Sequence, residues 1–477
     1  MRGAAVLVSG LASAALLAGC GGGPGQRVRP VADSTAVHVV DPGTVPGLSV
    51  ATRNEQDGRR HLYAAWPRIP GADRLTAALA AAVDERIRPF LADTGDRTPG
   101  AVPELNVQWS LAAASGDVVG VRLVFAESAG ASAGEARRTL WYDGRTGEVR
   151  PSADLLRAGG GLAGLAERVR ARLGGKGDPA RVTAGADTFS SLGFNDVGDM
   201  VVEFSDNTVA PGSSGRVAVV LERADYEPLL SEFGRRAYAA AMAPRPRLAL
   251  DGSATPSPTA TPGATPDATV PPGRTDCATA KCVALTFDDG PGPATGRLLD
   301  TLRDARARAT FFVVGTNADA HADLLRREHA EGHEIGNHTQ SHRDLSRLTA
   351  VQVNSDVQRT QEIVRSATGT APTLMRPPYG ATNGTVAGVT RSLGLRQVLW
   401  SVDTNDWRDR DAKVVADRAV RRARPGAVIL MHDIHRTTVD AVPEILERLA
   451  AKGYTFVTVS ELMANRKVPP GGRFGGA

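Results

Sequence analysis

The chain has 477 residues, a length that predicts two or three domains. Of these residues, 42% are hydrophobic and 23% are charged, a composition typical of a soluble globular protein. Its formal net charge is only +4 and no block of basic residues is present. Nucleic-acid binding usually needs a concentrated basic face, so the charge pattern argues against it.

The N-terminus has the features of an export signal. Met1 and Arg2 precede an apolar run over residues 4–19, which is too short to span a bilayer comfortably and ends in small residues. The end of this run, Leu-Ala-Gly followed by Cys20, resembles the bacterial lipobox and implies cleavage after a signal peptide of residues 1–19, with lipid on Cys20. The alternative is a plain secretory signal with an incidental cysteine. We expect a chain anchored by lipid on the outer face of the cell membrane, facing the wall.

Two segments that cannot bury a core divide the rest of the chain. Residues 20–45 are rich in Gly, Pro and small polar residues and are predicted to be a flexible stalk. Residues 243–275 form a Pro/Thr-rich linker of the kind that behaves as an extended spacer. We therefore expect an N-terminal module over residues 46–242, a C-terminal module over 276–466 and a disordered tail over 467–477.

The N-terminal module is predicted to be an α+β domain with an antiparallel sheet. Apolar residues at every fourth position predict one helix, whose stripe is Leu75, Leu79, Val83 and Ile87. Strands are predicted where apolar residues alternate or flank turn residues, over 105–111, 119–125, 141–142, 148–149, 200–204 and 216–221. This module contains no cluster of His, Cys or paired carboxylates that indicates catalysis.

In the C-terminal module, strand-like runs alternate with helical patterns. The predicted strands cover residues 283–287, 310–314, 334–336, 373–376, 397–402, 427–431 and 455–459. Seven strands alternating with helices imply a parallel sheet, either doubly wound or closed into a barrel. At the start of this module, Cys277 and Cys282 could form a disulfide in an oxidising compartment; a metal role is the weaker alternative, because two ligands make a poor zinc site.

Side chains that could take part in catalysis or metal binding directly follow the strands of the C-terminal module. They are Asp288, Asp289, His338, His342, Arg376, Asp403, Asp406 and His432. The carboxyl ends of parallel strands open onto one face, where residues from different strands converge. We therefore expect these side chains to form one site.

The spacing of His338 and His342 suggests a metal site. Two imidazoles at i and i+4 lie on one face of a helical turn, and a carboxylate from another strand end would complete a three-ligand site with room for water. Asp288 and Asp289 are adjacent carboxylates that repel unless a cation or partner is near. One could bind the metal while the other accepts a proton. The alternative, a helix N-cap, explains one Asp but not two.

Five motifs of the C-terminal module resemble those of the NodB-type polysaccharide deacetylases, carbohydrate esterase family 4. They are TFDDGP (286–291), HTQSH (338–342), RPPYG (376–380), DTNDW (403–407) and LMH (430–432), in the family's order. The resemblance covers nearly the whole module. It implies a distorted (β/α)7 barrel. The preceding module resembles accessory domains found ahead of the catalytic domain in some peptidoglycan deacetylases and in surface sensors that bind lysozyme.

The resemblance also implies roles on one side of the site. Asp289, His338 and His342 would hold a divalent metal, commonly zinc in this family. Asp288 would be the general base, and Arg376 would tune it.

On the other side of the site, His432 would protonate the leaving amine and Asp403 would hold its imidazole. The backbone N–H of Tyr379 would help to bind the oxyanion. Trp407 and Leu430 would line the acetyl pocket, although both could be plain core residues.

These expectations favour an enzyme that removes N-acetyl groups from GlcNAc or MurNAc of peptidoglycan and releases acetate. Its partners would be the wall polysaccharide and, through its lipid, the membrane; we expect a monomer that binds no nucleic acid. The alternatives are a deacetylase of chitin oligomers, an acetylxylan esterase, or a non-catalytic surface sensor whose barrel is vestigial.

Overall fold

A computed structural model describes residues 35–56, 59–94, 102–129, 132–214, 216–250 and 275–476. The predicted signal peptide and Cys20 lie outside the described residues, as do most of the predicted stalk and linker. Across the described ranges, no helix has the length and apolar character needed to cross a membrane. Below, the N-terminal module means the described residues from 35 to 250, and the C-terminal module those from 275 to 476.

The N-terminal module is built on a six-stranded sheet in the order β1-β2-β3-β4-β5-β6. The strands are β1 (Ser49–Gln56), β2 (His61–Arg68), β3 (Glu104–Ser115), β4 (Val118–Ala129), β5 (Ser132–Asp143) and β6 (Glu148–Pro151). All neighbours pair antiparallel except β2 and β3, which are parallel because helix α1 (Asp73–Asp93) forms the crossover between them. The predicted helix and antiparallel strands are therefore confirmed, with one parallel pair added.

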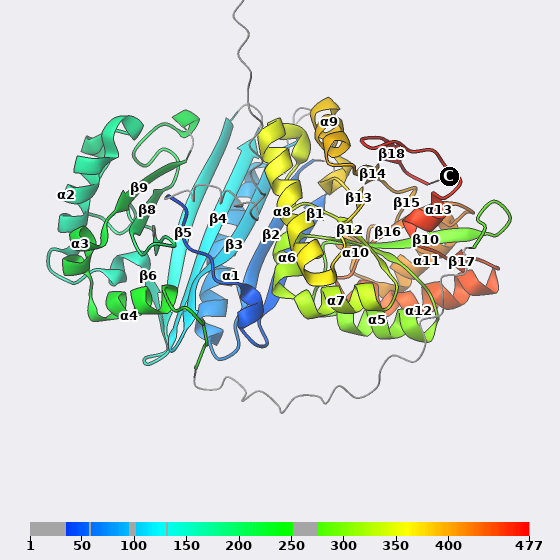
Figure 1. Ribbon diagram of the computed structural model, residues 1–477, viewed down its shortest axis with the longest axis horizontal. Helices are drawn as coiled ribbons and strands as arrows, with labels where there is room; N and C mark the ends of the chain where they lie inside the picture. Colours follow the sequence, from blue (N-terminus) through cyan, green and yellow to red (C-terminus); the bar gives the residue numbers. More distant parts are fainter. Residues whose placement is uncertain are drawn as a thin grey trace, which may run out of the picture.

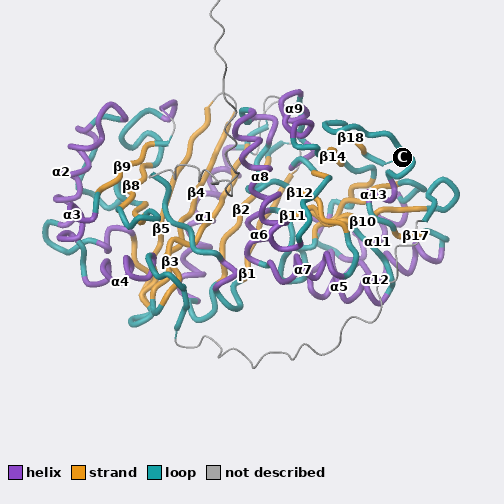
Figure 2. The backbone as a smooth tube through the Cα atoms, viewed as in Figure 1, coloured by secondary structure: helices purple, strands orange, loops and turns teal. Residues whose placement is uncertain are grey.

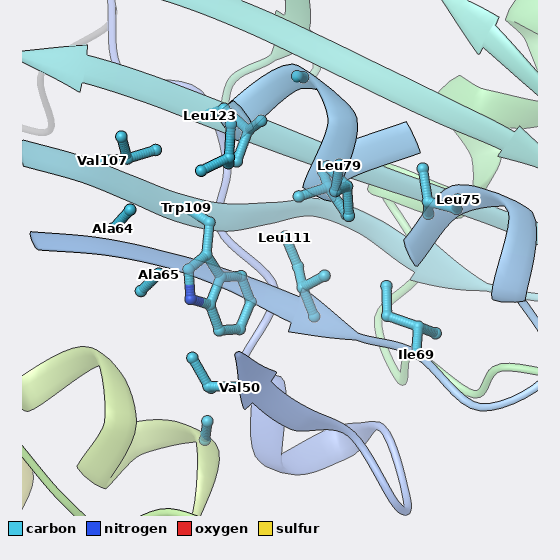
Figure 3. Packing of buried hydrophobic residues seen from close by; sticks show 14 of the residues in the cluster. Val50, Ala64, Ala65, Ile69, Leu75, Leu79, Val107, Trp109, Leu111 and Leu123 are labelled. Atoms are coloured by element: carbon cyan, nitrogen blue, oxygen red, sulfur yellow. The ribbon is translucent and has the colours of Figure 1, made fainter. Parts of the chain in front are cut away.

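Helix α1 packs its predicted stripe against this sheet. Leu75, Leu79, Val83 and Ile87 are each 1% exposed or less and share a hydrophobic cluster with residues of β1–β4. Figure 3 shows part of this cluster, with Leu75 and Leu79 projecting from the helix among side chains of the sheet. Burial of this stripe stabilises the helix, because helices in proteins depend mainly on packing of an apolar face.

The N-terminal module has a second layer, which lies on the side of the module that faces away from the C-terminal module (Figure 1). It holds a three-stranded antiparallel sheet and three helices: β7 (Ser191–Phe194), β8 (Met200–Phe204), β9 (Val217–Leu221), α2 (Gly161–Leu173), α3 (Arg223–Tyr226) and α4 (Glu232–Ala241). The six-stranded sheet therefore stands in the middle of the molecule, between this layer and the C-terminal module.

The C-terminal module has a curled, parallel sheet of nine strands. Eight follow the order β15-β16-β10-β11-β12-β13-β14-β18, and β17 pairs with β10. Their bounds are β10 (Cys282–Asp288), β11 (Thr310–Val313), β12 (Glu334–Asn337), β13 (Leu374–Met375), β14 (Arg396–Val398), β15 (Val402–Asp403), β16 (Ala427–His432), β17 (Thr455–Phe456) and β18 (Arg473–Phe474). The parallel sheet predicted from the alternating pattern is confirmed.

Helices connect these strands and cover the sheet (Figure 2). They are α5 (Thr295–Asp304), α6 (Gly315–Ala320), α7 (Ala322–Ala330), α8 (Ala350–Thr368), α9 (Gly384–Ser392), α10 (Asp406–Asp409), α11 (Ala412–Arg422), α12 (Arg436–Ala451) and α13 (Val459–Leu462). The predicted fifth strand is in fact two, β14 and β15, which lie near opposite ends of the strand order although residues 399–401 alone separate them. The sheet must therefore curl until its two edges approach each other.

Three predicted boundaries need correction. Val40 is 2% exposed and bridges to Leu111, so the end of the predicted stalk is part of the N-terminal module. Leu248 bridges to Gly116, so the start of the predicted linker also packs there. Phe474, in the predicted disordered tail, lies in β18 and is 6% exposed. In each case, apolar residues of a segment predicted to be unstructured pack against the neighbouring module.

At the start of the C-terminal module, Cys277 and Cys282 form a disulfide with their Cα atoms 5.4 Å apart. The bond ties the segment before β10 to the first residue of that strand.

Candidate functional site

The polar residues that follow the strands converge at one end of the curled sheet. Asp288 ends β10 and pairs in register with His432 at the end of the neighbouring strand β16. His338 directly follows β12 and Arg376 directly follows β13. Since these strands are neighbours in one parallel sheet, their carboxyl ends bring the four side chains together.

Asp289, His338 and His342 form a group that could hold a metal ion. One ligand atom from each lies within 4.8 Å of the others, and all three residues are buried. Oδ1 of Asp289 is 3.5 Å from Nε2 of His338 and 3.2 Å from Nε2 of His342. These distances bring the predicted ligands from two different loops to one point.

The electrostatics of the group suit metal binding. Burial and the nearby His342 lower the pKa of His338 to about 3, so its imidazole is neutral at physiological pH. Burial would raise the pKa of Asp289, but the His342 imidazole holds it well below its usual range, so the carboxylate is ionised. Metal binding needs a neutral imidazole and an ionised carboxylate, which are the forms that His338 and Asp289 take here.

Contacts around these residues also fit a metal. Oδ1 of Asp289 is buried without a hydrogen-bond partner among the described residues, and it faces the two imidazoles. Nδ1 of His338 lies 2.7 Å from the backbone oxygen of Arg376, which fixes the proton there and leaves Nε2 free to bind a metal. A His₂-carboxylate set leaves open positions for water, as in catalytic zinc sites.

The two histidines lie on a loop, which corrects the predicted helical turn. Thr339 and His342 have left-handed φ values of 68° and 52°, and no helix covers residues 338–342. The side-chain oxygen of Asn337 accepts from the N–H of Thr339, and Oγ1 of Thr339 accepts from the N–H of His342. These side-chain contacts to the backbone shape the turn that points both rings toward Asp289.

Asp288 and Arg376 form a buried ion pair beside the candidate metal site. Nη1 of Arg376 donates to Oδ1 of Asp288 at 2.7 Å, and the two side chains are almost completely buried. Burial raises the pKa of Asp288 to about 6, against the opposing effect of Arg376. A carboxylate with a pKa near 6 is ionised at neutral pH and can still accept a proton efficiently.

Asp406, and not Asp403 as predicted, is the partner of His432. Nδ1 of His432 lies 2.9 Å from Oδ1 of Asp406, and Oδ2 of Asp406 accepts from the backbone N–H of His432 and from Thr438. Burial would lower the pKa of His432, but the Asp406 carboxylate raises it to about 10. The imidazole is therefore protonated at neutral pH and can donate a proton.

Three further residues have predicted roles, and one of them, Tyr379, contacts a candidate metal ligand. Tyr379 has an unusual left-handed φ of 59°, and its ring makes an edge contact with that of His342 at 4.8 Å. Trp407 in α10 and Leu430 in β16 are 6% and 1% exposed, respectively. Positive φ in a bulky residue is strained and clusters at functional sites.

The N-terminal module also reaches this site, which the sequence did not reveal. The amide of Asn54 donates to Oδ2 of Asp289 at 2.6 Å, and the ring of Tyr63 stacks on that of His342 with centroids 4.4 Å apart. A polar Asn at an inward position of β1 was the available signal, but nothing in the sequence identified its partner.

Comparisons with known proteins agree with this geometry. The family profile described as "Polysaccharide deacetylase" matches residues 275–398. The chain is 43% identical over 188 residues to the peptidoglycan-N-acetylmuramic acid deacetylase PdaC of Bacillus subtilis, covering 39% of this chain and 40% of that protein. It is likewise 43% identical over 189 residues to the peptidoglycan-N-acetylglucosamine deacetylase PgdA of Listeria monocytogenes, covering 39% and 40%.

A third relative is matched over most of its length. It is a peptidoglycan-N-acetylglucosamine deacetylase of Bacillus cereus, 38% identical over 200 residues, which cover 40% of this chain and 73% of the relative. By contrast, the chain spans only about two fifths of the length of PdaC and PgdA.

Proposed function

Since the chain belongs to the polysaccharide deacetylase family, we propose that it hydrolyses the N-acetyl groups of peptidoglycan amino sugars, releasing acetate and leaving a free amine. The convergence of an Asp-His-His group with a buried base on one side and a protonated imidazole on the other carries this proposal. The relatives named above are described as acting on GlcNAc or MurNAc of peptidoglycan, which supports the wall polysaccharide as the substrate.

Asp289, His338 and His342 would hold the metal, for which the nitrogen and oxygen ligands favour Zn²⁺. When bound, a divalent metal would polarise the acetyl carbonyl and lower the pKa of a water molecule.

The residues on either side would move the protons. Asp288 takes the proton of the attacking water, and Arg376 keeps its carboxylate ionised and oriented. His432 then donates its proton to the amide nitrogen, which is a poor leaving group without it. Asp406 holds the imidazole in place and stabilises its charge.

Other residues would position the acetyl group. The backbone N–H of Tyr379 would stabilise the oxyanion, a contribution of about a hundredfold in rate for such donors. Trp407 and Leu430 would line the pocket for the methyl group. Asp403, whose Oδ1 accepts from the N–H of Asn405, would shape the loop that carries Asp406.

The location that we propose for the protein rests on its sequence. The lipobox-like end of the apolar run supports lipidation of Cys20 and attachment to the outer face of the cell membrane. From there a monomeric chain would act on the adjacent wall.

Mass spectrometry of muropeptides tests this function in cells. Cells that express the wild-type chain should contain unacetylated amino sugars that are missing from cells without it and from cells with Asp288→Asn. The identity of the unacetylated sugar distinguishes GlcNAc from MurNAc. The proposal would be contradicted by identical muropeptide profiles in the cells with the wild-type chain, with Asp288→Asn and without the chain, provided that the protein is present in the wall fraction.

A further inference from the structure

One face of the N-terminal sheet lies directly on the candidate metal site. Asn54 of β1 pairs with Tyr63 of β2, which pairs with Asn106 of β3, so the three residues form one row across adjacent strands. All three contact the C-terminal module: Asn54 at Asp289, Tyr63 at His342, and Asn106 at the backbone of the same loop. The row therefore lies against the candidate metal site.

Two members of the row touch metal-binding residues. Asn54 donates to Oδ2 of Asp289, while Oδ1 faces the two histidines, so the amide is compatible with a bound metal and orients the carboxylate. Tyr63 stacks on His342 with an angle of 18° between the rings. Both side chains come from a module with no catalytic cluster of its own.

The rest of the interface surrounds this centre. His61 stacks on Tyr379 with ring centroids 3.9 Å apart and planes 5° from parallel. The amides of Asn106 and Gln108 both donate to the backbone oxygen of Ser341, at 2.8 and 2.7 Å.

At one edge, the carboxylate of Glu104 accepts from the backbone N–H of Asp344 at 2.8 Å. Arg347 donates to the backbone oxygen of Val102 and to Ser128. Val314 and Ala320 of the C-terminal module belong to the hydrophobic cluster of the N-terminal module. The closed arrangement is thus held by apolar contacts as well as hydrogen bonds.

This arrangement leaves the site inaccessible to a polysaccharide. Asp288, Asp289, His338, His342 and His432 are each 2% exposed or less. A glycan strand must bring a whole sugar ring and its acetyl group to these atoms, which requires an open groove. The hydrogen bonds that cross the interface are ones that water can replace, as in interfaces between domains that move.

We infer that the N-terminal module is an intramolecular cap that holds the site closed, so that the glycan reaches it only after the two modules separate; this inference rests on the function proposed above. The closed chain is latent, and opening removes Asn54, His61 and Tyr63 from the site without breaking any covalent bond.

Asn106→Asp in the full-length chain with Zn²⁺ tests the cap. This change replaces an amide donor with a carboxylate facing the backbone oxygens of Ser341 and His342, and it alters no side chain of the C-terminal module. Losing two hydrogen bonds should favour the open state by about tenfold. Amide hydrogen exchange of residues 338–343 and acetate release from soluble muropeptides should both rise by about that factor. Asn207→Asp, the same change of charge at an exposed turn, should match the wild type.

A second variant protects the test against misfolding. Arg347→Glu weakens the same interface from the C-terminal side, at a residue outside the catalytic groups. If either variant keeps the melting profile of the wild type and yet shows unchanged exchange and acetate release, the cap is excluded. Rapid deacetylation of intact glycan by a wild-type chain whose exchange stays slow would also exclude it. Faster exchange in both variants, with no acetate from any chain, would support the cap and contradict the proposed function.

Discussion

Nδ1 of His432 and Oδ1 of Asp406 lie 2.9 Å apart in a pair whose members are each 2% exposed or less. The left-handed conformation of Asn405, with φ of 52°, turns the chain after β15 and directs Asp406 back toward β16. Asp403 pairs in register with Leu430, two residues before His432, and its Oδ1 is used by Asn405. Asp406 is therefore the residue placed to orient the imidazole and stabilise its charge.

We expect Asp406→Asn to lower kcat for acetate release by about 10²- to 10⁴-fold, the range for loss of an oriented acid–base group. Asp403→Asn should lower it less than about tenfold, because Asp403 does not contact the imidazole. Both substitutions are made in a chain whose interface is weakened, such as Asn106→Asp, and kcat is measured by steady-state kinetics on muropeptides. Because Asp406 also accepts from Thr438 and from the backbone N–H of His432, melting profiles check that the Asp406→Asn chain still folds. The opposite ranking of the two variants would restore Asp403 as the partner.

The metal site makes a separate prediction. Asp289→Ala removes the only carboxylate of the Asp-His-His group and should weaken Zn²⁺ binding by at least about a hundredfold. This is at least as large as the effect of removing a residue that only supports a metal ligand. Asp288→Asn should retain Zn²⁺ binding and lose acetate release, because Asp288 contacts Arg376 and is proposed to act on water. Calorimetric titration of the metal-free chains with Zn²⁺ separates the two outcomes. Equal affinities for Asp289→Ala and the wild type would place the metal elsewhere.

Much of this architecture could be predicted from periodicity and motif order. The stripe of α1 and the parallel strands of the C-terminal module follow from local hydrophobic patterns, and Asp288, His338 and His432 follow from their positions at strand ends. Hydrophobic patterns predict these elements because the spacing of apolar residues along a strand or helix determines which face of that element is buried.

The remaining features depend on contacts between distant residues. Spacing could not show that His338 and His342 lie on a loop, because that turn is set by side-chain bonds to its own backbone. Nor could it show that Asn54 meets Asp289, 235 residues later. Such pairings are determined by how two modules pack, which leaves no periodic signal in either.

The disulfide between Cys277 and Cys282 should contribute modestly to stability. Closing so short a loop restricts the unfolded chain by roughly 2 kcal/mol in the loop-entropy treatment. We expect the Cys277→Ser/Cys282→Ser chain to unfold at a lower denaturant concentration and to bind Zn²⁺ with unchanged affinity. The bond lies at the start of β10, whereas the ligand Asp289 follows the other end of that strand. A loss of Zn²⁺ affinity in a chain that still melts cooperatively would show that the bond also supports the site.

Within the N-terminal module, buried Glu203 should make stability sensitive to acid. It lies in β8 and accepts from Arg122 of β4 at 2.5 and 2.8 Å and from Arg216 at 2.9 Å, which joins the two sheets. Burial would raise the pKa of Glu203, but these guanidinium groups lower it from 4.5 to about 2. Because the pKa of Glu203 is lower in the folded chain than in the unfolded chain, its ionised carboxylate stabilises the fold at every pH above 4.5. That stabilisation is lost as the pH falls from 4.5 toward 2.

We therefore expect Glu203→Gln to lower the free energy of unfolding of the N-terminal module by roughly 3 kcal/mol at pH 7. At pH 3 the difference from the wild type should shrink by about 2 kcal/mol, because the wild-type carboxylate has by then lost most of its advantage over the unfolded chain. Calorimetric unfolding of both chains at the two pH values gives the comparison, with Glu85→Gln, an exposed carboxylate paired with Arg138, as the matched control. A difference between Glu203→Gln and the wild type that stays constant from pH 7 to pH 3 would mean that the charge of Glu203 does not hold the two sheets together.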